Sequence, residues 1–130
     1  PAQKCIAQAR KLFLDGQHKS AMDALEQELN RSNRNLDKLE LRLEQCRLLI
    51  QGGHWLGATA LADELLTFYK KLRLGEWSIN LGMDVLTVAR RAWQGFDSEQ
   101  SKKRLEDIQR QMVLLRPSSA FDDEPGLQDA

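Results

Sequence analysis

Two cysteines and two histidines are the residues of this 130-residue sequence with the clearest capacity for chemistry. Cys5, His18, Cys46 and His54 together supply the four thiolate and imidazole ligands of a common type of structural zinc site. Such sites usually bring their ligands in close pairs, whereas these four residues are spread singly along the chain. We therefore expect no metal site, and we interpret both cysteines as small buried hydrophobic residues.

The sequence also lacks the pattern of a catalytic centre. A cysteine–histidine nucleophilic pair needs a third, orienting residue and an oxyanion cradle, and nothing in the sequence marks either one. Gly52-Gly53 is not followed by the Gly-Lys-Ser/Thr of a phosphate loop. Glu44 stands near Arg42 and Arg47, which indicates a solvated ion-pair surface. We predict a protein that is not an enzyme and that uses no cofactor.

The charge balance excludes further classes of function. Lys plus Arg and Asp plus Glu number 19 each, so there is no basic excess to replace the counterions of nucleic acid. No apolar run is longer than four residues, which is too few for insertion into a membrane or for a signal-peptide core. The chain begins at Pro1, from which we expect a piece of a longer protein, and the few cysteines favour the cytoplasm.

Apolar residues recur every three or four positions between glycines, which predicts an all-α fold of about six helices in a bundle of antiparallel hairpins. Ser20 is expected to cap the second helix, and Asp97 to open the sixth with Gln100 in a capping box. Gly75 is expected to end the fourth helix. The expected helices cover residues 2–14, 20–29, 36–51, 54–74, 77–94 and 97–116.

The predicted domain boundary lies at residue 116. We expect residues 1–116 to form one helical domain, because Pro117 forbids continuation of its last helix. Residues 117–130 contain four acidic residues and no basic one. This composition predicts an acidic, flexible tail.

A weak internal repeat relates two of the expected hairpins. Gly16 precedes Ala21 by the same spacing as Gly53 precedes Ala58, at an offset of 37 residues. In each hairpin, the glycine turns the chain and the small alanine lets two helices approach closely. The pattern fits tetratricopeptide-like repeats, and it equally fits two ordinary helical hairpins in a bundle.

Aromatic residues gather near helix ends and hinges, where most are expected to pack in the core. Trp and Tyr are enriched at subunit interfaces, so one or two of these aromatic side chains are candidates for interface anchors. Trp77, directly after Gly75-Glu76, and Phe121, in the tail region, are the predicted interface residues.

Five segments of the sequence carry a resemblance to a known family: ARKLFLDGQHKSAMDALEQEL at 9–29, LRLEQCRLLIQGG at 41–53, LGEW at 74–77, LGMDVL at 81–86 and LRP at 115–117. In their order and spacing they resemble the C-terminal domain of the TssA/VasJ component of the bacterial type VI secretion system. The resemblance covers about residues 4–122, implies that residues 1–116 are an oligomerisation domain, and carries over no catalytic residue.

The resemblance implies a structural role in a bacterial cytoplasmic assembly. In that family the domain forms a ring with copies of itself, and a hexamer or a dodecamer is expected. The implied partners are sheath, inner-tube, spike and baseplate components of the secretion tail, and proteins of the membrane complex. The alternative is a tetratricopeptide-like adaptor or secretion chaperone that binds a peptide in a helical groove.

Overall fold

The computed structural model describes residues 1–122 and consists of helices and their connections. Within these residues no strand occurs, which confirms the all-α prediction. The elements are α1 (Ala2–Leu14), α2 (His18–Arg31), α3 (Asn35–Gln51), α4 (Trp55–Lys71), α5 (Leu74–Trp77), α6 (Ile79–Gln94), α7 (Glu99–Leu115) and the 3-10 helix η1 (Pro117–Phe121).

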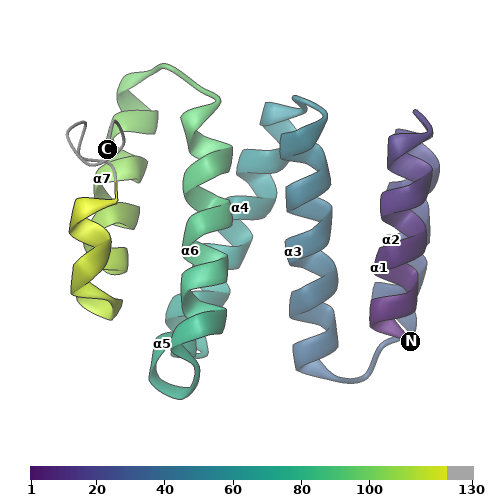
Figure 1. Ribbon diagram of the computed structural model, residues 1–130, viewed down its shortest axis with the longest axis horizontal. Helices are drawn as coiled ribbons and strands as arrows, with labels where there is room; N and C mark the ends of the chain where they lie inside the picture. Colours follow the sequence, from purple (N-terminus) through teal and green to yellow (C-terminus); the bar gives the residue numbers. More distant parts are fainter. Residues whose placement is uncertain (123–130) are drawn as a thin grey trace.

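The long helices form antiparallel hairpins that stand side by side in a row (Figure 1). The pair α1–α2 closes one edge of the row, and α7 with η1 closes the other. Helix α3 packs against α1, α2, α4 and α6, and α4 lies against α3 and α6. Each hairpin thus packs mainly on its neighbours, as in tetratricopeptide-like arrays.

The two hairpin turns at Gly16 and Gly53 have the same backbone geometry. Both glycines are left-handed, with φ of 83° and 73°, a conformation that L-residues with a side chain rarely adopt. In each turn the residue after the glycine donates its N–H to the carbonyl five positions earlier, which defines a Schellman motif. These bonds run from Gln17 to Leu12 (3.0 Å) and from His54 to Leu49 (2.8 Å).

The alanines that follow these turns are fully buried, as the repeat predicts. Ala21 and Ala58 each have 0% relative exposure, and they lie on α2 and α4 within the two hairpins. The 37-residue repeat therefore describes real structural equivalence between the hairpins α1–α2 and α3–α4.

Helix α3 joins two hydrophobic clusters. Its residues Leu41 and Leu48 pack in the cluster built with α1 and α2. Leu39, Leu43 and Cys46 instead pack in the larger cluster built with α4, α5, α6 and α7. A helix with apolar residues on two faces is a buried helix, and α3 holds the first hairpin to the rest of the row.

The chain between α4 and α6 differs from the prediction. The fourth helix ends at Lys71 rather than at residue 74, and Arg73 takes a left-handed conformation (φ 51°). Gly75 lies inside the short helix α5, which the sequence did not predict. A Cβ at Gly75 would come within 2.9 Å of a Leu115 methyl carbon and 3.0 Å of the Tyr69 hydroxyl. Gly75 therefore serves the close approach of α5 and α7 rather than a helix break.

Two predicted helix caps are wrong. Helix α2 begins at His18, so Ser20 lies inside it, because the Schellman turn leads almost directly into the helix. Helix α7 is capped by Ser98, whose hydroxyl accepts the N–H of Ser101 at 3.2 Å, so Asp97 is not the cap.

The segment after α7 also differs at its start. Residues 117–121, predicted to begin a flexible tail, form η1, and Ser119 is buried there with 1% exposure. The amide of Gln109 donates to the Ser119 carbonyl at 3.5 Å. Residues 123–130, which carry most of the predicted acidic tail, lie outside the described residues.

Candidate interaction surfaces

The two histidines meet where the hairpin turns of α1–α2 and α3–α4 lie together. Nδ1 of His18 and Nε2 of His54 are 3.2 Å apart, and the exposed rings share a hydrogen bond. The ring of Phe13 stacks on His18 with centroids 3.8 Å apart and an interplanar angle of 6°. A Cβ at Gly52 would come within 2.8 Å of both the Phe13 and His54 rings, so a glycine is needed beside this contact between the two hairpin turns.

The two cysteines lie elsewhere. The Cys5 thiol donates to the carbonyl of Ala24, and the Cys46 thiol donates to the carbonyl of Ala58, each at 3.4 Å. Residues 1–122 contain no group of three or more His, Cys, Asp or Glu side chains placed to hold a metal ion. The four residues considered as zinc ligands therefore do not come together.

Burial keeps the cysteines in their thiol form. It raises the pKa of Cys46 to about 12, and burial is also the main cause that raises the pKa of Cys5. The thiolate is the nucleophilic form, so these environments oppose nucleophilic chemistry.

The predicted interface residue Trp77 lies on α5 with 56% of its surface exposed. Its indole N–H donates to the carbonyl of Leu72 at 3.1 Å, just beyond the last residue of α4. This bond fixes the ring across the end of α4 while leaving more than half of the side chain accessible. The geometry suits an anchor, because little conformational entropy remains to be lost on binding.

Three further large apolar side chains are exposed at the same end of the helices as Trp77. Leu72, Ile79 and Leu36 have 43%, 50% and 41% exposure. They lie where α3 and α6 begin and where α4 ends, which is the lower end of the helices in Figure 1. We call Leu36, Leu72, Trp77 and Ile79 the apolar end.

The second predicted interface residue, Phe121, lies apart from these residues. It is 55% exposed on η1, at the outer edge of the row beyond α7 (Figure 1). The sequence did not reveal the apolar end as a unit, because its members belong to three helices and a connecting residue that only the fold brings together.

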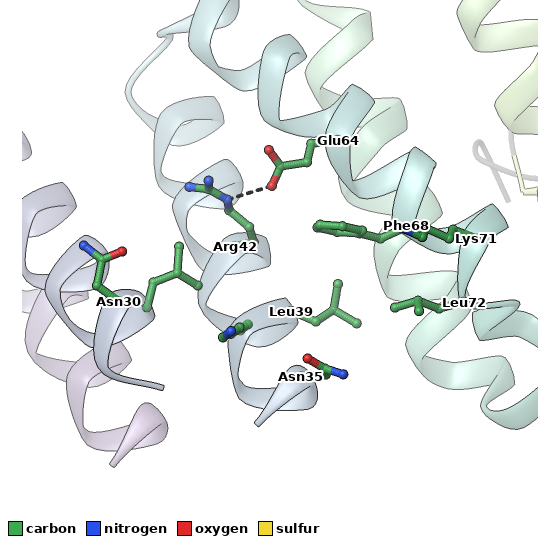
Figure 2. A pocket seen from close by; sticks show the side chains of 10 residues that line it. Asn30, Asn35, Leu39, Arg42, Glu64, Phe68, Lys71 and Leu72 are labelled. Carbon is green, nitrogen blue, oxygen red and sulfur yellow. Dashed lines mark hydrogen bonds and ion pairs between the residues drawn. The ribbon is translucent and has the colours of Figure 1, made fainter. Parts of the chain in front are cut away.

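A groove between α2 and α4, with α3 as its floor, is a second candidate surface. It has a volume of about 440 Å³, and Figure 2 shows Phe68 reaching from α4 toward Leu39 and Arg42 on α3. Arg42 donates to the carboxylate of Glu64 at 2.9 Å, which closes one side of the groove. Its lining residues are Leu29, Asn30, Asn35, Lys38, Leu39, Arg42, Glu64, Phe68, Lys71 and Leu72.

Comparison with known protein families identifies a match over most of these elements. A family model described as type VI secretion, with the members EvfE, EvfF, ImpA, BimE and VasJ, matches residues 1–89, from α1 into α6. The chain belongs to this family. A search of curated proteins and a search of solved structures each found no match.

Membership of the VasJ family makes this a type VI secretion related protein, from a structural family of the secretion system that is not known for enzymatic activity. The matched region contains the whole groove and all four residues of the apolar end, whereas Phe121 lies beyond it. Within residues 1–122, no helix is long and apolar enough to cross a membrane.

Proposed function

We propose that this chain is a ring-forming structural domain of a type VI secretion tail assembly protein. The observation that carries the proposal is the apolar end, where four large apolar side chains are exposed at the same end of the helices. Neighbouring exposed apolar side chains of this kind mark sites of protein contact. We propose that the partner of the apolar end is a further copy of the same chain, as suits a component of a secretion assembly.

A closed ring is the simplest assembly consistent with this role. Head-to-tail contacts that close give rings, whereas contacts that do not close give filaments. The balanced charge of 19 basic and 19 acidic residues imposes no net repulsion on many adjacent copies. We propose a hexamer or a dodecamer in the bacterial cytoplasm, which contacts sheath, inner-tube, spike and baseplate components and the membrane complex.

Light scattering coupled to gel filtration tests the proposal directly. We expect the intact chain to elute at six or twelve times the mass of one chain at micromolar concentration. A stable monomer over that range contradicts the ring.

The groove between α2 and α4 supports the second candidate function, an adaptor or chaperone that binds a peptide. A groove with an apolar floor and a few polar groups fits an extended or helical segment of another protein. An adaptor of this kind is expected to be monomeric or dimeric, so the same mass measurement separates the two functions.

A further inference from the structure

The groove between α2 and α4 combines an apolar floor with a cationic rim. Leu39 lies on the α3 floor, Leu29 and Phe68 add apolar side chains from the walls, and Leu72 belongs both to the groove and to the apolar end. Its volume of about 440 Å³ lies within the range of about 300–1,000 Å³ typical of ligand sites. A large apolar side chain can therefore be accommodated.

The charge of the groove selects an anionic ligand. Three cationic residues line it against one acidic residue, and that residue, Glu64, is already paired with Arg42. Lys38 and Lys71 remain, and neither makes an ion pair with another of the residues that the structure describes. A segment with several carboxylates around one apolar side chain complements this arrangement.

The chain itself contains such a segment. Residues 123–130, with the sequence DEPGLQDA, carry Asp123, Glu124 and Asp129, no basic residue, and one large apolar residue, Leu127. They follow directly on Asp122, at the edge of the row formed by α7 and η1 (Figure 1).

The position of the groove favours a segment from another copy. The groove lies next to the first hairpin, and the described chain ends at the opposite edge of the row (Figure 1). When two copies stand head to tail, the α7–η1 edge of one adjoins the α1–α2 edge of the next. That arrangement brings residues 123–130 of the first copy close to the groove of the second.

We propose that residues 123–130 of one copy bind in the groove between α2 and α4 of the next copy. Leu127 packs on Leu39 and Phe68, and the carboxylates of the segment pair with Lys38 and Lys71. The contact is heterologous, so it closes when the copies form a ring. The inference rests on the proposed ring for its partner, and the experiments below separate the two.

A labelled peptide of residues 121–130, titrated into the intact chain, tests recognition of the segment. We expect saturable binding that Lys38→Glu with Lys71→Glu weakens by at least about tenfold. The matched control is Lys11→Glu with Lys103→Glu, two exposed lysines on α1 and α7 that should leave affinity unchanged. Absence of binding, or equal loss in both double variants, overturns the proposal. If the chain is monomeric and still binds the peptide through Lys38 and Lys71, the groove recognises the segment but no second copy supplies it, which overturns the contact between copies together with the ring.

Charge exchange between chains tests whether the segment comes from a second copy. One chain carries Lys38→Glu and Lys71→Glu, and the other carries Asp123→Lys and Glu124→Lys. Each alone should sediment as smaller species than the unmodified chain, and mixing them should restore the large species. If mixing fails and the large species returns only when one chain carries all four substitutions, the segment binds in the groove of its own chain. That result overturns the proposal. A ring that keeps its mass in every variant also overturns it, while leaving the proposed function intact.

Discussion

Arg10 on α1 holds the buried carboxylate of Glu44 on α3 through two hydrogen bonds, of 2.9 Å and 2.8 Å. The Glu44 side chain is only 2% exposed, whereas that of Arg10 is 57% exposed. The hydrogen bond to Glu44 is the main cause that raises the pKa of Arg10 above its ordinary value. Arg47 stands 3.7 Å from the same carboxylate as a second, weaker partner. An ion pair between a buried carboxylate and a partly exposed guanidinium therefore joins the first hairpin to the second.

Loss of Arg10 should destabilise the fold. Arg10→Met keeps the aliphatic stem but leaves a buried carboxylate with only Arg47 beside it. We expect the free energy of unfolding to fall by about 1–3 kcal/mol, less than for a fully buried pair, because Arg10 is half exposed. Denaturant unfolding measures this change.

The double variant Arg10→Met with Glu44→Leu is the control for this interpretation. Replacing both partners removes the buried charge, so most of the lost stability should return. If the double variant is less stable than Arg10→Met, the cost arises from lost packing rather than from an unpaired carboxylate.

Ala58 should tolerate no larger side chain. It is fully buried on α4, so Ala58→Leu must overpack the hairpin, and we expect a loss of about 1–3 kcal/mol. Ala60→Leu is the matched control, because Ala60 lies two residues further along α4 and is exposed. Equal urea midpoints for the two variants would show that the site can expand.

The hairpins were predictable from the sequence because their signals are local. A glycine five residues before an alanine, repeated at Gly16 and Gly53, marks a turn and a close helix contact without knowledge of distant residues. The 3.6-residue period likewise located the long helices to within a few residues. Both signals act within one or two helical turns.

The remaining features depend on contacts between distant segments. Glu44 was interpreted as part of a solvated surface, and its burial becomes visible only when α1 packs over α3. The left-handed Arg73 has no sequence signal, since the close approach of Gly75 to Leu115 sets the path of the chain there. The groove and the apolar end depend on three or more elements each, so no single stretch of sequence predicts them.

Two glycines should respond to alanine for different reasons. Gly95 has an ordinary backbone conformation, but an added Cβ would overlap the Trp55 ring. Gly16 has open space around it but a φ of 83°. Replacing it with alanine therefore costs about 1–2 kcal/mol of stability through backbone strain. We expect both variants to be less stable, and only Gly95→Ala to change tryptophan fluorescence. An unchanged emission spectrum in Gly95→Ala contradicts the contact with Trp55.

The apolar end leads to the last prediction, which concerns assembly. If this surface holds copies together, Trp77→Ala should shift the chain toward smaller species, because Trp is a frequent energetic anchor of interfaces. The substitution also removes the hydrogen bond to the Leu72 carbonyl, so Ile79→Lys provides a second test that leaves this bond in place. Leu56→Ala is the control, since Leu56 is 80% exposed but lies near the start of α4, at the end of this helix opposite to Leu72. Light scattering should report smaller species for both test variants and an unchanged mass for the control, with thermal unfolding used to confirm that each is folded. If Trp77→Ala and Ile79→Lys keep the mass of the unmodified chain, the apolar end is not the contact between copies.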